Sequence, residues 1–160
     1  MLTAERLRHL VKYDPDTGLF TNISPRKKIV VGSLAGTFDK SNGYICLCVD
    51  RQRVYGHRLA YLYMTGEWPD GLIDHINGVR TDNRWANIRL GSRELNQQNM
   101  RKANKTSASG LIGAFKKRNK WESKIKVHGI AIGLGSFDTA EQAHHAYVQA
   151  KRLHHAGCTI

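Results

Sequence analysis

The stretch LIDHINGVRTDNRWANIRLGSRELNQQNMR, residues 72–101, decides the fold that the sequence predicts. Residues 72–75 form a short apolar run that ends in two polar residues, and residues 87–90 form a second short run. A polar loop separates the two runs, and Ser92 can cap a helix that follows the second run. We therefore expect a strand, a loop, a second strand and a helix, with the strands paired as a hairpin that folds onto the helix.

Four polar side chains of this segment would meet in such a hairpin. Asp74 and His75 end the first strand, Asn87 begins the second, and Asn96 lies one turn into the helix. Hydrolysis of a phosphodiester needs a base to activate water and a divalent cation to neutralise the charge that develops on the phosphate and the leaving oxygen. A neutral His can take the proton near about pH 7. The pattern therefore makes a metal-assisted DNA-cutting enzyme the leading hypothesis.

Structural roles are the alternative for each of these residues. A surface histidine, or an Asn in a turn or a helix cap, would use the same residue types. Asn83 and Asn99 lie close by in the sequence, and we expect both to be structural. We expect His57 to pack or to form a hydrogen bond at the start of a helix over residues 57–64, which Gly66 would end.

The charge of the chain favours a polyanionic partner. Lys and Arg number 25 against 13 Asp and Glu, and residues 101–160 hold 11 of the basic and 3 of the acidic residues, a net charge of +8. Double-stranded DNA or RNA suits a compact basic domain better than a membrane surface does. A basic protein without such a partner is the alternative.

The chain shows no targeting or disulfide pattern. No run of about 18 apolar residues could span a bilayer, and the amino terminus lacks the apolar stretch of a signal peptide, so we expect a cytoplasmic protein with no membrane partner. Cys46, Cys48 and Cys158 lack disulfide spacing, so we expect reduced thiols. Cys46 and Cys48 should share one face of a strand over residues 44–49 and be buried or half-buried. A zinc site that combines this pair with His57 is disfavoured, because a C-x-C lacks the usual second pair of ligands.

The length of 160 residues suits two small modules. The amino-terminal residues 1–53 predict a strand-rich lead-in that begins with a helix over 1–12 and includes strands at 19–21 and 44–49. Residues 102–110 have no apolar periodicity and indicate a flexible basic linker. Three strands are expected after the linker, at 111–115, 121–127 and 130–134. Thr139 begins a final helix, with a capping box to Gln142.

The motif residues closely resemble those of phage HNH endonucleases, including homing-type enzymes with a ββα-metal core. The residues that carry the resemblance are His57-Arg58-Leu59, Asp74-His75-Ile76-Asn77-Gly78, Asn83, Asn87-Ile88-Arg89 and Asn96. The resemblance implies a nuclease core over residues 54–101, in which His75 is the general base and Asn87 braces the loop and orients His75. It also implies that Asp74 and Asn96 bind the metal.

Asn96 departs from many HNH enzymes, which have a His as the last motif residue. An Asp carboxylate and an amide oxygen form an all-oxygen ligand set. Such a set suits a single Mg²⁺ or Mn²⁺ ion better than Zn²⁺.

The carboxyl-terminal part is similar to the AP2 DNA-binding domain. The matching segments are Gly113-Ala114-Phe115, Lys120-Trp121-Glu122, Gly133-Leu134-Gly135-Ser136-Phe137, Thr139-Ala140-Glu141-Gln142-Ala143 and Ala146-Tyr147. The resemblance implies a small three-stranded antiparallel sheet with one helix over residues 111–157, whose exposed face lies in the major groove. The expected DNA contacts are Arg101, Lys102, Lys105, Lys116, Lys117, Arg118, Lys120, Trp121, Lys124 and Lys126. Trp121 could equally belong to the core.

These observations together predict an α+β protein that contains a ββα-metal nuclease core, a strand-rich lead-in and an AP2-like module. We expect a divalent-metal-dependent, strand-nicking endonuclease that hydrolyses phosphodiester bonds of double-stranded DNA. It should need no small-molecule cofactor and act as a monomer or weak dimer. A non-catalytic DNA-binding or regulatory protein that retains the HNH fold is the alternative.

Overall fold

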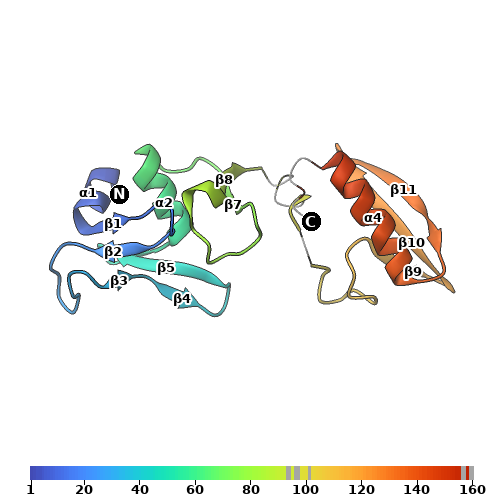
Figure 1. Ribbon diagram of the computed structural model, residues 1–160, viewed down its shortest axis with the longest axis horizontal. Coiled ribbons are helices and arrows are strands. Elements are labelled where there is room, and N and C mark those ends of the chain that lie inside the picture. The colour runs from blue at the N-terminus through green and yellow to red at the C-terminus, as the bar shows by residue number, and fades with distance from the viewer. Residues whose placement is uncertain (93–94, 96–97, 101, 156–157, 159–160) are drawn as a thin grey trace. The chain divides into compact units, whose positions relative to one another are not determined.

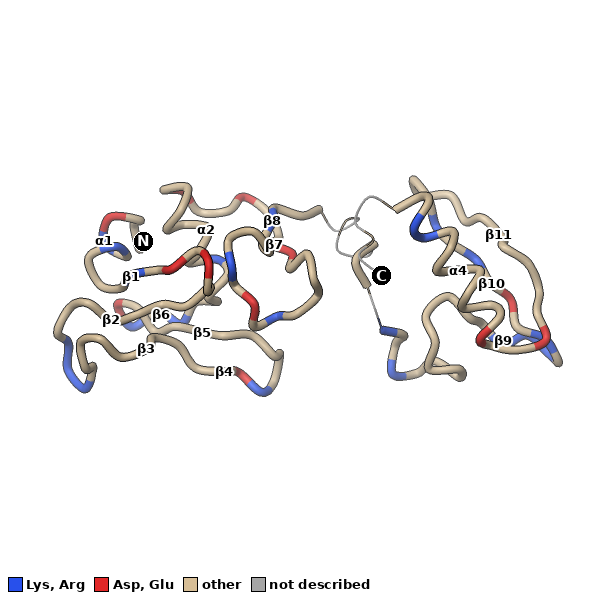
Figure 2. Tube along the Cα trace, viewed as in Figure 1, with Lys and Arg blue, Asp and Glu red and all other residues tan. Residues whose placement is uncertain are grey.

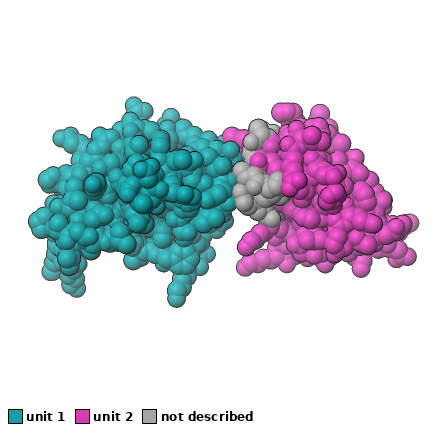
Figure 3. All heavy atoms as spheres, in the orientation of Figure 1, with its two compact units in different colours: residues 1–92 teal, residues 93–160 magenta. Residues whose placement is uncertain are grey.

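A computed structural model of the chain describes residues 1–92, 95, 98–100, 102–155 and 158. The chain divides into two compact units, Met1–Ser92 and Arg93–Ile160 (Figure 3). Each unit combines short antiparallel strands with helices, so the expected α+β class is confirmed. Among the described residues, no helix is both long and apolar enough to cross a membrane.

Unit 1 builds three small antiparallel sheets around two α-helices (Figure 1). Its sheets have the strand orders β1-β2-β3, β4-β5-β6 and β7-β8. The elements are α1 (Ala4–Leu10), β1 (Val11–Tyr13), β2 (Phe20–Asn22), β3 (Leu34–Ala35), β4 (Thr37–Asp39), β5 (Tyr44–Val49), β6 (Gln52–Tyr55), α2 (Gly56–Thr65), β7 (Leu72–His75), the 3₁₀ turn η1 (Trp85–Asn87) and β8 (Ile88–Gly91).

The two helices of unit 1 begin and end where local chemistry predicts. The Thr3 hydroxyl caps α1 by accepting a hydrogen bond from the Arg6 backbone N–H at 3.2 Å. Gly66 ends α2 with φ +86°, a left-handed conformation that glycine adopts without strain from a Cβ atom. The predicted helix at the amino terminus and the one over residues 57–64 are therefore confirmed, each within a few residues.

One continuous apolar core holds unit 1 together. It runs from Leu2 in the amino-terminal segment to Ile88 in β8, and Leu7, Leu59 and Leu62 at its centre are almost fully buried. Burying one such side chain contributes about 1.5–3 kcal/mol. The residues before position 54 therefore stabilise the same core that supports the β7–β8 hairpin.

The β5–β6 hairpin was not predicted, because its turn lacks the usual sequence signal. Val49 pairs with Gln52, so Asp50 and Arg51 alone form the turn, with φ values of +47° and +65°. Two positive φ values define a type I′ turn, which normally uses Asn-Gly or Asp-Gly. The sequence of β6 is mostly polar, so it lacks the alternation of apolar and polar residues that would predict a strand.

The expected burial of both cysteines of β5 is wrong for Cys48, which is exposed, whereas Cys46 is buried. Cys46 lies between Thr37 of β4 and Tyr55 of β6. Cys48 lies beyond the end of β4 and pairs with Arg53. Neighbouring strands therefore cover one thiol and leave the other in solvent.

The described strands of unit 2 form a three-stranded sheet, and α4 covers one face of it (Figure 1). The strands β9 (Ala114–Lys117), β10 (Lys120–Val127) and β11 (Ile130–Phe137) lie in the order β11-β10-β9, and α4 (Ala140–His154) packs against all three. The predicted capping box of Thr139 and Gln142 is present at the start of α4. This confirms the prediction of three strands followed by a helix.

The first strand of unit 2 begins later than expected because Gly113 turns the chain. Gly113 has φ +78°, and a Cβ atom there would lie 2.0 Å from Cγ of Tyr147 on α4. Only a glycine allows the backbone to approach the helix so closely. The core below it is built from Ala114, Ala140 and Ala143, whose small side chains let helix and sheet approach.

Candidate active site

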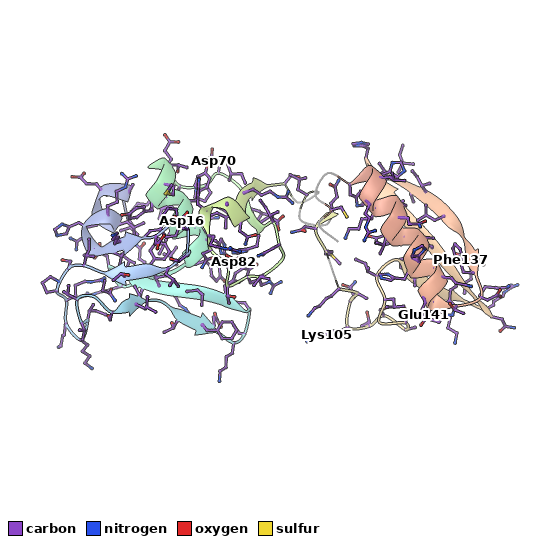
Figure 4. The ribbon with its side chains drawn as sticks, in the orientation of Figure 1. Asp16, Asp70, Asp82, Lys105, Phe137 and Glu141 are labelled. Carbon is purple, nitrogen blue, oxygen red and sulfur yellow. The ribbon has the colours of Figure 1, made fainter. Side chains whose placement is uncertain are left out.

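The β7–β8 hairpin carries the predicted active-site residues. His75 pairs with Ile88 and Asp74 with Arg89, so both residues lie at the loop end of β7. The backbone N–H of Ile76 donates to the Asn87 carbonyl at 2.8 Å, which closes the loop that joins the two strands. Asp82 lies in this loop (Figure 4). Asn96 lies outside the described residues.

The side chain of Asn87 braces this loop from inside. Its Oδ1 accepts a hydrogen bond from the Asn77 backbone N–H at 2.9 Å, and its Nδ2 donates to the Asp82 carbonyl at 2.7 Å. Asn87 is 7% exposed, so both bonds are shielded from water. The amide therefore joins the beginning of the loop to its far side without contributing a charge.

The carboxylate of Asp82 adds a second set of bonds to the loop. It accepts from Asn77 Nδ2 at 2.6 Å and from Arg84 Nη2 at 2.6 Å. The hydrogen bond from Arg84 is the main cause that lowers the pKa of Asp82 to about 2. Asp82 therefore stays ionised and keeps the loop closed at neutral pH.

His75 is buried and held by a polar neighbour. The residue is 4% exposed, and its Nε2 lies 3.1 Å from Oδ1 of Asn83. Burial lowers the pKa of His75, while the bond to Asn83 and the nearby Asp74 partly oppose this shift. His75 is therefore an uncharged imidazole at neutral pH, the form that a general base requires.

An aromatic group surrounds His75. The His57 ring lies 5.1 Å from the His75 ring at an interplanar angle of 82°, and the Tyr44 ring lies 5.9 Å from His75. Burial, His75 and Arg58 lower the pKa of His57 to about 3. The Nδ1 of His57 is buried without a hydrogen-bond partner in the described part of the chain. The expected packing role of His57 thus places it directly against the imidazole of His75.

Asp74 offers the carboxylate that a cation would need. Arg89 binds its Oδ2 through Nη2 at 2.9 Å and through Nε at 3.3 Å, and the Asp74 side chain is 13% exposed. The described residues contain no group of three or more His, Cys, Asp or Glu that could hold a metal ion. Of the two predicted metal ligands, Asp74 lies among the described residues, and its carboxylate oxygens are of the type that Mg²⁺ and Mn²⁺ accept. Because Arg89 already neutralises part of the charge, affinity for the free ion should be weak.

The side chain that contacts His75 Nε2 is that of Asn83. It was expected to be structural, and the role of orienting His75 was given to Asn87. Both side-chain ends of Asn87 bind backbone atoms of the loop instead. A run of polar residues precedes η1 in the sequence, but the sequence alone does not show which of these side chains points toward His75.

The basic residues expected to bind DNA fall into groups in unit 2. Lys120, Lys124 and Lys126 lie at alternating positions of β10 on the face opposite buried Ser123 and Ile125, and all three are exposed. Figure 2 colours the Lys and Arg positions along the chain. Lys117 pairs with Glu122 and Lys120 with Asp138, which reduces the positive charge at one end of this face. The Lys124 ammonium lies 4.9 Å from the Phe115 ring.

Other expected DNA contacts lie elsewhere. Trp121 packs against the alanine core on the α4 side of the sheet, with the Lys116 ammonium 5.9 Å from its ring. Trp121 therefore takes the core role, which was the alternative to a contact with DNA. Along β10 it lies an odd number of positions from each exposed lysine, and side chains at odd separations in a strand point to opposite faces. Arg118 lies in the β9–β10 turn with φ +53°. Lys102 and Lys105 precede the sheet, and Arg101 lies outside the described residues.

Comparison with known proteins agrees with the geometry of the hairpin. Residues 54–98 match a protein-family model described as HNH endonuclease. No curated protein and no solved structure gave a match. The matched range contains α2, β7 and β8, and it excludes the segment that resembles AP2 domains. The similarity to HNH endonucleases therefore concerns the part of the chain that carries α2 and the β7–β8 hairpin.

Proposed function

We propose that the protein is a divalent-metal-dependent DNA endonuclease whose general base is His75. The observation that carries the proposal is a buried, uncharged imidazole that is held by Asn83 and lies next to the Asp74 carboxylate. A base and a ligand for a cation at adjacent positions of one strand are what phosphodiester hydrolysis requires. The family match over residues 54–98 supports the same reaction class.

In the proposed reaction, His75 takes a proton from a water molecule while the water oxygen attacks the phosphorus. The new bond joins that oxygen to phosphorus, the bond between phosphorus and the 3′ oxygen breaks, and the 3′ oxygen takes up a proton from solvent. Asp74 and Asn96 would hold Mg²⁺ or Mn²⁺, which would supply electrostatic stabilisation of the phosphate and the leaving oxygen. Asn87 keeps the loop closed at the end of β7, where His75 and Asp74 lie.

The proposed division of labour follows the chain. Residues 54–101 would cut DNA, with the lead-in of residues 1–53 supporting them. The linker over 102–110 and the AP2-like module over 111–157 would hold the duplex through the exposed lysines of β10. One reaction centre cuts one strand at a time, so a monomer should nick.

The test is incubation of the purified protein with supercoiled plasmid and Mg²⁺ or Mn²⁺. Nicked circles should form, and EDTA should prevent them. His75→Ala should lower the nicking rate by at least about 100-fold, the usual contribution of a general base. His9→Ala, which removes an exposed histidine on α1, is the matched control and should nick normally. If the protein binds duplex DNA yet forms no nicked circle with any divalent ion, the non-catalytic alternative holds.

A further inference from the structure

The contact between Asn83 and His75 defines which nitrogen of His75 is basic. A side-chain amide oxygen is an acceptor only, so a hydrogen bond between Asn83 Oδ1 and His75 Nε2 requires the proton on Nε2. A neutral imidazole carries one N–H, and its other nitrogen then has the lone pair. The lone pair of His75 would therefore lie on Nδ1.

The surroundings of Asn83 hold its side chain in this orientation. Asn83 is 2% exposed, and the Tyr13 hydroxyl donates to its backbone carbonyl at 2.6 Å. Its Nδ2 lies beside Gly56. A Cβ atom at Gly56 would lie 2.9 Å from Asn83 Nδ2 and 3.4 Å from the Ile45 carbonyl oxygen. The nitrogen end of the amide packs against Gly56, and the oxygen end lies 3.1 Å from His75 Nε2.

A second glycine fixes the backbone of Asn83. Gly18 has φ +72°, and a Cβ atom there would lie 2.5 Å from the carbonyl carbon of Asn83, too close for any residue but glycine. The amino-terminal segment therefore encloses Asn83 from β1 and from the turn before β2. A side chain so enclosed can hold a hydrogen-bond partner in one position, since it has little rotational freedom of its own.

We propose that Asn83 is a positioning residue that fixes His75 in the Nε2–H tautomer and so presents Nδ1 to the attacking water. This inference rests on the proposed function, because it assigns the nitrogen through which the general base acts. Asn83 acts through His75 and touches neither water nor phosphate. The Asn87 amide holds the loop, and the Asn83 amide holds the imidazole.

The test combines three variants in the full-length protein. Asn83→Leu keeps the number and branching of side-chain heavy atoms but has no acceptor, and it should lower kcat for plasmid nicking by about 100-fold, the cost of misplacing a reacting group. KM for DNA should change less than about threefold, because the duplex makes no contact with Asn83 in the proposed complex. Asn83→Asp keeps an acceptor oxygen and should retain more activity than Asn83→Leu. Tyr13→Phe removes the bond to the Asn83 backbone but not the one to His75, so it should lower kcat less than Asn83→Leu does.

A spectroscopic readout separates positioning from folding. In protein labelled with ¹⁵N-histidine, long-range proton–nitrogen correlations distinguish the two neutral tautomers, and His75→Gln identifies the His75 signals. The unsubstituted protein and Tyr13→Phe should show the Nε2–H form, and Asn83→Leu should shift His75 toward a mixture. A purely structural role for Asn83 would leave the tautomer unchanged in every variant that folds.

The outcomes distinguish this inference from the proposed function. An Nδ1–H tautomer in the unsubstituted protein overturns the inference, as does full kcat in Asn83→Leu. Should Asn83→Leu fail to fold, the tautomer of the unsubstituted protein and the activity of Asn83→Asp decide. A protein that nicks no DNA refutes the proposed function, while the tautomer measurement needs no cleavage and still tests the hydrogen bond.

Discussion

Acid should destabilise unit 1 through the buried ring of His57. Its pKa in the folded protein is about 3, against an ordinary value of 6.5, because burial and then His75 and Arg58 disfavour the imidazolium form. The unfolded chain therefore binds a proton that the folded chain does not, once the pH falls below about 6.5. The stability is complete above that pH and declines by about 1.4 kcal/mol for each pH unit as the pH falls toward the folded pKa. Between about pH 6.5 and about pH 5 the loss is roughly 2 kcal/mol.

The assay is urea unfolding of the unsubstituted protein and of His57→Gln at several pH values. Trp68 and Trp85 pack on the core of unit 1, so their fluorescence reports that unit alone in a Trp121→Phe background. Between about pH 6.5 and about pH 5, the free energy of unfolding of the unsubstituted protein should fall by roughly 2 kcal/mol more than that of His57→Gln. His75 is present in both proteins, so the difference between them reports His57 together with its coupling to His75.

Parallel pH dependences for the two proteins would refute this reasoning, because they would mean that His57 binds its proton equally in the folded and unfolded chains. His9→Gln is the matched control, since His9 is exposed on α1 and its loss should not alter the pH dependence.

Three further predictions concern the loop, the helix contact and the DNA face. Asn87→Ala should destabilise unit 1 by roughly 2–4 kcal/mol in urea unfolding, because it removes two buried hydrogen bonds and leaves their partners unpaired; a loss below about 1 kcal/mol would contradict the bracing role. Gly113→Ala should lower the thermal midpoint of unit 2 well beyond Gly129→Ala, since both positions have positive φ but a Cβ atom at Gly129 would meet nothing within 4 Å; equal midpoints would show that Tyr147 moves aside freely. Lys124→Gln with Lys126→Gln should lower the slope of log affinity for duplex DNA against log salt by roughly 0.9 for each phosphate that these lysines neutralise, and an unchanged slope would argue against this face.

Local chemistry predicts much of the fold. The strand over residues 72–75, the end of α2 at Gly66 and the capping box of Thr139 each depend on neighbours within a few positions. Such features can be read from sequence because the interactions that stabilise them are local. The β5–β6 hairpin escaped prediction for the opposite reason, since strand pairing imposes its I′ turn on residues that rarely form one.

The sequence by itself led to the proposed reaction class, because Asp74, His75 and Asn87 offer a carboxylate, a base and a loop amide at a recognisable spacing. Only the tertiary structure decided how these groups are held. It places the Asn83 side chain against His75, and it packs Trp121 against the alanine core beside α4. Both outcomes depend on contacts between residues far apart in the chain, such as Tyr13 with Asn83. A spacing in the sequence shows which side chains are available, whereas the path of the backbone through the core selects the atoms that meet.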